Sequence, residues 1–489
     1  MRRTRFQVVS SDDESDVISF GPNMRRRRAI LGGAAVVAIA AVAVVATRAY
    51  GTRQPDDAVA PAAASGTELQ RIEGELATWT RAARIDPYSA MFPAHAATLH
   101  LQRGRLTGDY RDAIAAESLS RQSLAQRTQH NAAAFVTLAA SLLEQHRFGE
   151  ANGVARQLVA GQPDVDAYHS LLGETELELG NYDLAHRAFS AIRTPSATLS
   201  TMAGLARWSE MRGDDRFALS LLRTARRAAE RRPGEMREEV GWYYMREADI
   251  ELRRGRTRAA AEALQAGLAL APTDYRLLAA RSRLAAARGE WNDAARYGEA
   301  SVFNVLDPTT LVVVATAYGE LGDTARAHEA ERAADASVRG QAGTLHRAWA
   351  MYQLDRGRQV DSITNLARRE LLVRRDVQTL DLLAWAELKS GRPQEARRHM
   401  LEALRPGFVD PSMMYHAGFV HLASGDTMAG EAMLQRALAT DRRSAPHYAR
   451  DARAALDRVD AARDGRRTLA ARTAARARRV ARSLVRQDS

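Results

Sequence analysis

From about residue 68 onward, apolar and polar positions recur along the chain with the period of an α-helix. Apolar residues are three and four positions apart, and the helix-favouring residues Ala, Leu, Arg and Glu dominate. The two-residue alternation of β-branched and polar residues that indicates strands is absent from the sequence. We therefore predict that this part of the chain is all-α.

A repeat of about 34 residues runs through these predicted helices. Each copy has a glycine in a short turn, a small residue seven positions before it and another small residue five positions after it. Eight copies follow this rule: Gly173/Gly180/Ala185, Ala206/Gly213/Ala218, Ala248/Gly255/Ala260, Ser282/Gly289/Ala294, Ala315/Gly322/Ala327, Ala350/Gly357/Ser362, Ala384/Gly391/Ala396 and Gly418/Gly425/Gly430. Two degenerate copies precede them, at Gly108/Ala113 and Ala139/Ala151.

This repeat suits two antiparallel helices that cross closely. Small side chains let the two backbones approach each other, and glycine can adopt the left-handed conformation that ends the first helix. A large residue four positions after the second small one, such as Phe189 or Leu434, is expected to fill the space beside the next hairpin. Gly298 and Glu331 take that place in two copies, so we expect looser packing at those two joints.

The segments LLGETELELGNYDLAHRAF (171–189) and LLAWAELKSGRPQEARRHMLEAL (382–404) contain the full pattern. They resemble the tetratricopeptide repeat (TPR) family, and the resemblance covers roughly residues 90–440. It implies a right-handed α-solenoid of about ten helical hairpins, which we place at residues 67–440. It also implies that proteins or peptides bind on the concave face that the first helices form.

In this register the concave face carries aromatic, arginine and methionine side chains, which are common in protein interfaces. The candidate partner-binding residues are Arg207, Trp242, Met245, Arg283, Arg347, Trp385, Tyr415 and Phe419. The alternative for each of them is packing between adjacent hairpins. TPR modules that bind a C-terminal carboxylate use recurrent Lys and Asn residues on this face, and their absence here disfavours that ligand.

An uncharged run of nineteen residues, 29–47, precedes the repeats. As a helix it would be about 28 Å long, close to the thickness of a bilayer's hydrocarbon core. The four arginines 25–28 before it outnumber the two that follow, which favours a cytoplasmic segment 1–28 and an extracytoplasmic body. We predict a single transmembrane signal anchor at 29–47 and a flexible linker at 48–66. A cleaved secretory signal or a twin-arginine export signal is the alternative.

The formal net charge of +11 is concentrated at the two ends of the chain. Residues 1–28 contain seven arginines and four acids, and residues 466–489 contain eight arginines and one aspartate, so the body between them is nearly neutral. We interpret residues 441–489 as a capping helix and an Arg-rich tail, which either lies on anionic lipid headgroups or stays solvated. Nucleic acid is not an expected partner, because the predicted topology places the body outside the cytoplasm.

The sequence contains no recognisable catalytic constellation. It has no cysteine, and its twelve histidines are scattered. The pairs His95/His100 and His416/His421 are five residues apart, whereas two metal ligands on one helix face are four apart. HExxH, P-loop, GxSxG and GxGxxG motifs are absent. We therefore expect no enzyme activity, no metal site and no cofactor.

Together these features favour a membrane-tethered TPR scaffold that mediates protein–protein interactions on the extracytoplasmic (periplasmic) side of a bacterial inner membrane. The alternative is an envelope-biogenesis component, such as a periplasmic TPR module of polysaccharide or protein secretion. The expected partners are other proteins or peptides on the concave face, and the membrane through the N-terminal helix.

Overall fold

The computed structural model describes residues 63–194, 198–232, 236–340, 345–440 and 446–485. These residues form 22 helices and no strand, which confirms the all-α prediction. Twenty of the helices form ten antiparallel hairpins in succession, a TPR-like solenoid, between the flanking helices α2 (Ala63–Ile85) and α23 (Pro446–Val485).

The N-terminal predictions fall largely beyond the described part of the chain. The segment 1–28, the expected membrane span 29–47 and most of the predicted linker lie outside it. None of the helices that the structure describes is long and apolar enough to span a bilayer. The last residues assigned to the linker, 63–66, belong to the first turns of α2, where Ala63 and Ala64 favour helix.

Each hairpin pairs a first helix with the helix that follows it. The first helices are α3 (Met91–Thr107), α5 (Ala132–Glu144), α7 (Asp166–Leu179), α9 (Leu199–Met211), α11 (Arg237–Arg253), α13 (Tyr275–Arg288), α15 (Pro308–Glu320), α17 (Arg347–Asp355), α19 (Val377–Lys389) and α21 (Pro411–Ala423). The second helices are α4 (Tyr110–Gln126), α6 (Phe148–Gly161), α8 (Tyr182–Ser190), α10 (Asp215–Glu230), α12 (Thr257–Leu270), α14 (Trp291–Asn304), α16 (Thr324–Gly340), α18 (Val360–Leu371), α20 (Pro393–Leu404) and α22 (Thr427–Thr440).

The glycine of the repeat ends the first helix of nearly every hairpin in a left-handed conformation. Its φ lies between 65° and 92° in nine hairpins, including all eight that follow the sequence rule. In the second hairpin His146 occupies this position with a φ of 58°. The predicted role of the glycine is therefore confirmed.

The small residues lie where the two helices of a hairpin cross. A methyl group added to Gly173 would come within 2.6 Å of the Phe189 ring, so the large residue fills the space that the glycine leaves. The hairpin of α17 and α18 departs from the rule because its turn contains a second left-handed residue, Gln359 (φ 55°). This extra residue shifts the register by one, so that Ile363 is buried where the sequence predicted Ser362, which is exposed.

The two joints that were expected to be loose are filled. Gly298 is buried against Val314, which leaves no room for a methyl group at the glycine. At the other joint the Glu331 carboxylate accepts a hydrogen bond of 2.6 Å from the Tyr352 hydroxyl. The prediction of looser packing is therefore wrong, because neighbouring side chains take up the space in both places.

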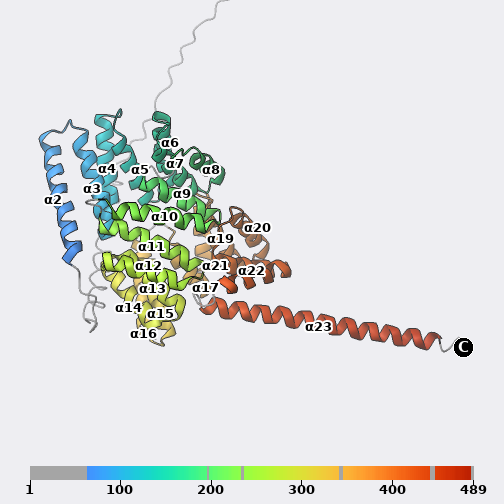
Figure 1. Ribbon diagram of the computed structural model, residues 1–489. Helices are drawn as coiled ribbons and strands as arrows, with labels where there is room; N and C mark the ends of the chain where they lie inside the picture. Colours follow the sequence, from blue (N-terminus) through green and yellow to red (C-terminus); the bar gives the residue numbers. More distant parts are fainter. Residues whose placement is uncertain (1–62, 195–197, 233–235, 341–344, 441–445, 486–489) are drawn as a thin grey trace, which may run out of the picture.

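The hairpins wind into a superhelix whose successive turns touch (Figure 1). The turn of an early hairpin lies against the end of the hairpin five places later. A methyl group added to Gly108 would lie 2.5 Å from the Val305 side chain, and one added to Gly213 would lie 2.7 Å from the Gly407 carbonyl oxygen. The turn glycines of the last five hairpins have no such neighbour within 4 Å: Gly289, Gly322, Gly357, Gly391 and Gly425.

Polar bonds join the third hairpin to the end of the eighth. The Arg375 amide donates to the Leu179 carbonyl oxygen at 3.0 Å, and the Val377 amide donates to the Tyr182 hydroxyl oxygen at 2.7 Å. Backbone and side-chain hydrogen bonds thus join segments that are 195 residues apart in sequence.

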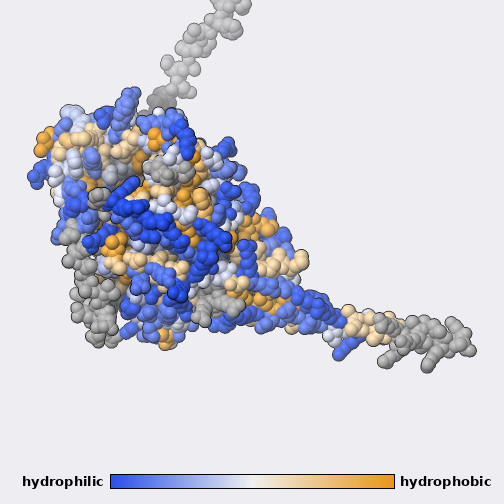
Figure 2. Space-filling model, viewed as in Figure 1, coloured by the Kyte–Doolittle hydropathy of each residue, from blue (hydrophilic) through white to orange (hydrophobic). Residues whose placement is uncertain are grey.

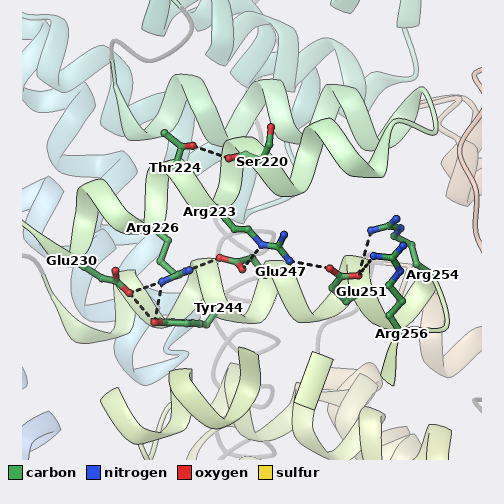
Figure 3. Close-up of polar contacts among 10 residues, drawn as sticks. All are labelled: Ser220, Arg223, Thr224, Arg226, Glu230, Tyr244, Glu247, Glu251, Arg254 and Arg256. Atoms are coloured by element: carbon green, nitrogen blue, oxygen red, sulfur yellow. Dashed lines mark hydrogen bonds and ion pairs between the residues drawn. The ribbon is translucent and has the colours of Figure 1, made fainter. Parts of the chain in front are cut away.

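Buried ion pairs join neighbouring hairpins as well (Figure 3). Glu247 and Glu251 on α11 are buried, and both accept hydrogen bonds from Arg223 on α10, at 3.2 and 2.9 Å. Arg226 bonds to Glu247 at 2.7 Å and lies over the Tyr244 ring. In Figure 2 a hydrophilic band crosses the middle of the molecule, in the region where Figure 1 labels α10.

The contact between superhelical turns can be isolated by one pair of substitutions. Gly180 (φ 78°) and Gly391 (φ 73°) both end first helices, but only Gly180 faces backbone from another turn, at Arg375. Gly391→Ala should lower the free energy of unfolding by about 1 kcal/mol through its strained φ alone. Gly180→Ala should cost about 1–3 kcal/mol more, because the turns must also separate.

Urea unfolding followed by circular dichroism measures both changes. Equal losses in the two variants would mean that the contact between turns contributes nothing to stability.

Candidate functional site

The eight candidate residues all lie on first helices, as the register predicts. Arg207 is on α9, Trp242 and Met245 are on α11, Arg283 is on α13, Arg347 is on α17, Trp385 is on α19, and Tyr415 and Phe419 are on α21. The structure brings three of them, Trp385, Tyr415 and Phe419, into one cluster, and Arg347 lies close to it. The other four lie on three consecutive hairpins, whose first helices are α9, α11 and α13.

The three candidate arginines are each bonded to a carboxylate of a neighbouring hairpin. Arg207 donates to Glu178 at 2.6 Å, and Arg283 donates to Asp249 at 2.9 Å. Arg347 donates to the fully buried Asp381 at 3.1 Å. Each pair joins consecutive first helices, so these arginines hold the concave surface together.

Trp242 and Met245 pack between hairpins. Trp242 is partly buried with its ring 5.0 Å from that of Tyr243, in an edge-on arrangement. Met245 is partly buried beside the cluster formed by Ala248, Leu264 and their neighbours.

The aromatic cluster lies at the C-terminal end of the concave face. Phe419 contacts Tyr415 edge-on at a centroid distance of 4.7 Å, and the Trp385 ring stacks on His416 at 4.5 Å. Tyr448, near the start of α23, stacks on Tyr415 at 4.2 Å. Trp385 and Tyr415 are each only 4% exposed, whereas Phe419 is half-buried. Among the three candidate residues of the cluster, Phe419 is therefore the one that a partner can reach.

A chain of hydrogen bonds sets the position of these rings. The Trp385 indole donates to Asp355 at 2.9 Å, and Asp355 also accepts from the Tyr448 hydroxyl at 2.7 Å. Burial, followed by the nearby Asp355 carboxylate, raises the pKa of Tyr448 far above that of an ordinary phenol, so the hydroxyl remains a donor. His416 lies 3.2 Å from the Tyr448 hydroxyl oxygen and 2.8 Å from an Asp381 oxygen.

Asp381 is the buried charge of this network. Burial alone would raise the pKa of its carboxyl group, but His416 and Arg347 outweigh burial, so its pKa lies below the ordinary value. The carboxylate therefore stays ionised and ties α17, α19 and α21 together. Through His416 and Tyr448 the same network reaches α23.

A pocket of about 290 Å³ opens between this cluster and α23. Its apolar lining comes from Trp385, Leu388, Tyr415, Phe419, Tyr448 and Ala454, and its charged lining comes from Asp355, Lys389, Asp451 and Arg458. The Lys389 ammonium lies 4.5 Å from the centroid of the Trp385 ring. Within the residues that the structure describes, neither Lys389 nor Arg458 has a carboxylate at ion-pair distance. The pocket thus combines an apolar floor with two carboxylates and with two exposed cations that have no ion-pair partner among the described residues.

Besides the apolar Leu388 and Ala454, sequence reasoning missed five polar residues of this pocket: Asp355, Lys389, Tyr448, Asp451 and Arg458. A signal existed for the first two, because each lies five positions after the small residue of its first helix, Ala350 or Ala384. Glu178 holds the same position in its hairpin and also lies on the concave face. The other three belong to α23, which has no copy of the repeat from which a register could be read.

A second polar group surrounds Arg207 on the same face. Glu174 is partly buried one helical turn before Glu178, and burial raises its pKa to about 7, with a further increase from Glu178 and an opposing effect of Arg207. At the third and fourth hairpins the charges of this group thus interact with one another.

The raised pKa of Glu174 predicts a dependence of stability on pH. Between pH 4.5, where an unfolded glutamate ionises, and about pH 7 the folded state retains a proton that the unfolded state loses, so this group costs stability as the pH rises. Glu174→Gln should therefore raise the free energy of unfolding by about 1–3 kcal/mol at pH 8 and leave it unchanged at pH 4.

Urea titrations at the two pH values measure this difference. Glu262→Gln, at an exposed helix pair, serves as the control and should have no effect at either pH. A stabilisation by Glu174→Gln that is equal at pH 4 and pH 8 would contradict the assignment.

Comparison with known proteins finds similar solved structures but no matching family model or curated protein. Among solved structures, the human IFIT1 dimer with PPP-AAAA is 13% identical, covers 76% of this chain and 94% of its own length, and has a TM-score of 0.40. The human IFIT1 dimer with m7Gppp-AAAA is 14% identical, and the match covers 76% of this chain and 86% of that one with a TM-score of 0.42. The APC/C hetero-tetramer Cut9–Hcn1 is 12% identical, and the match covers 77% of this chain and 89% of that one with a TM-score of 0.31. The TPR-like architecture of this chain rests on its own ten hairpins and their left-handed turns.

Proposed function

We propose that this chain is a scaffold that binds segments of other proteins in the pocket beside Phe419, while a membrane anchor at 29–47 holds it on the extracytoplasmic side of a bacterial inner membrane. The pocket is the observation that carries the binding part of the proposal. It places an accessible aromatic ring beside Lys389 and Arg458, which lack carboxylate partners among the described residues. The uncharged run 29–47 and the arginines before it support the membrane part.

The pocket favours a peptide over a small metabolite for two reasons. Its two cations lie on different helices, Lys389 at the end of α19 and Arg458 on α23, so an extended ligand can contact both. Its floor is aromatic and apolar, which suits one large side chain of a partner. A segment with an aromatic or aliphatic residue next to an acidic one would match both features.

Photo-crosslinking tests the binding site directly. A benzoylphenylalanine in place of Phe419 should crosslink a discrete partner in cells that express the full chain. The same replacement at Phe217, which is half exposed on α10, provides a matched control and should not give that product. Adding Lys389→Glu should reduce the crosslinked product at position 419 by about tenfold, because a cation at the pocket mouth becomes an anion.

Trp385 and Tyr415 are poor probes because both rings are buried, so their alanine variants would disturb folding. The same products from positions 419 and 217, or none from 419, would contradict binding in the pocket.

A pair of reporter fusions at residue 60 tests the topology. Alkaline phosphatase, which is active only outside the cytoplasm, should be active at this position, and green fluorescent protein exported unfolded should be dark. Fluorescent protein with inactive phosphatase would place the body in the cytoplasm and overturn the membrane part of the proposal, while the crosslinking result would stand by itself.

A further inference from the structure

Helix α23 leaves the body of the protein after its first turns. Ala449, Ala452 and Ala455 are buried against the last hairpin, and Arg463 still pairs with Glu431 of α22. From residue 464 to residue 477 every side chain is exposed. Figure 1 shows this part of the helix projecting away from the stacked hairpins.

The projection follows from a missing turn. Ala452 is a buried small residue of the kind found in each first helix, and Val459 lies seven positions after it, where the hairpins have their glycine. Valine does not adopt the left-handed conformation that ends a first helix, so α23 continues to Val485. The part beyond residue 463 is about 33 Å long at the rise of an α-helix.

The exposed part of α23 is strongly cationic, and few acidic side chains neutralise its arginines. Arg466, Arg472 and Arg476 have no carboxylate at ion-pair distance among the described residues, and Asp464 is the only acid in the exposed stretch. Arg472 and Arg476 are four residues apart, so they repel each other on one face of the helix. The same repulsion opposes pairing with a second copy of this helix. A ligand for this surface is therefore anionic.

The composition of the helix favours phospholipid headgroups over nucleic acid as the anionic ligand. Residues 464–485 contain no aromatic residue on which a base could stack, and no Asn or Gln that could read a base edge. They contain alanines, threonines and Leu469, which is 65% exposed. In Figure 2 the colour of the projecting helix changes from blue to pale toward its end. Arginines around a mildly apolar helix match a surface of charged headgroups above acyl chains.

We propose that residues 464–477 of α23 bind the anionic headgroups of a phospholipid bilayer. The helix lies along the surface, with its guanidinium groups on the phosphates and Leu469 toward the acyl chains. This contact would be a second attachment of the chain to a membrane. It is independent of the anchor proposed at 29–47, because it rests on the exposure and charge of α23 alone.

The absence of native cysteine allows a specific probe of this contact. Ala474, which is exposed, is replaced by Cys in the full chain and labelled with an environment-sensitive dye; Ser220→Cys on α10 carries the same dye as a control. Both proteins are reconstituted in nanodiscs of phosphatidylcholine alone or mixed with phosphatidylglycerol. The dye at 474 should shift to the blue and become protected from iodide only in the anionic discs, and added salt should reverse both effects.

Charge-removing variants measure the contribution of the arginines. Arg466→Gln, Arg472→Gln and Arg476→Gln together should weaken binding to anionic vesicles by about a hundredfold, about fivefold for each arginine. The matched control is Arg216→Gln and Arg227→Gln on α10 with Arg231→Gln directly after it, which removes three exposed arginines that also have no ion pair among the described residues. This control should leave the binding unchanged.

Three results would overturn the proposal. They are equal protection of the dye in neutral and anionic discs, equal losses in the two arginine triples, and a response to a single-stranded oligonucleotide without a response to anionic lipid. The last result would identify nucleic acid as the ligand. Because the dye reports on α23 itself, a failure of the topology proposed above is read separately, from the reporter fusions.

Discussion

The close approach of one superhelical turn to the next is the constraint on which the arrangement of the hairpins depends. An ordinary solenoid has contacts only between neighbouring repeats, so it can bend and twist along its length. Here the turns of early hairpins lie against backbone five hairpins later, at distances that only glycine allows, as at Gly213 and Gly407. The superhelix therefore has a set pitch, and the concave surface inside it has one shape.

These contacts also change how the chain folds. Tyr182 and the Val377 amide meet across 195 residues of sequence, so the interface between turns forms only after the later hairpins exist. A solenoid without such contacts can nucleate anywhere and lose repeats from an end with little effect on the rest. In this chain the loss of the last three hairpins would expose the turn at Gly180, remove Arg374 from Glu178 and remove the Val377 amide from Tyr182.

The sequence was sufficient for the local structure and for part of the site. All eight predicted turn glycines are left-handed, because a glycine between two helices serves the same local purpose in each copy. The register failed at Ser362, where a second left-handed residue, Gln359, could not be foreseen from spacing. All eight candidate residues were placed on first helices, yet Trp385 shares its apolar cluster with Ala452 and Ala455 of α23, which lies outside the repeat. Contacts between superhelical turns could not be predicted from the sequence either. The repeat specifies only how adjacent hairpins pack, whereas the pitch that brings Gly180 to Arg375 results from the packing angles of all the hairpins between them.

The pairing of the concave arginines has a consequence for how a partner would be recognised. A partner's carboxylate that approaches Arg207 or Arg283 must replace the carboxylate of Glu178 or Asp249 that is already bonded there. This exchange releases few counterions and contributes little to the free energy of binding. Lys389 and Arg458 are exposed and have no ion-pair partner among the described residues. The ionic-strength dependence of association would therefore report on these two cations, and the arginines that dominate the composition of the groove would contribute almost nothing to it.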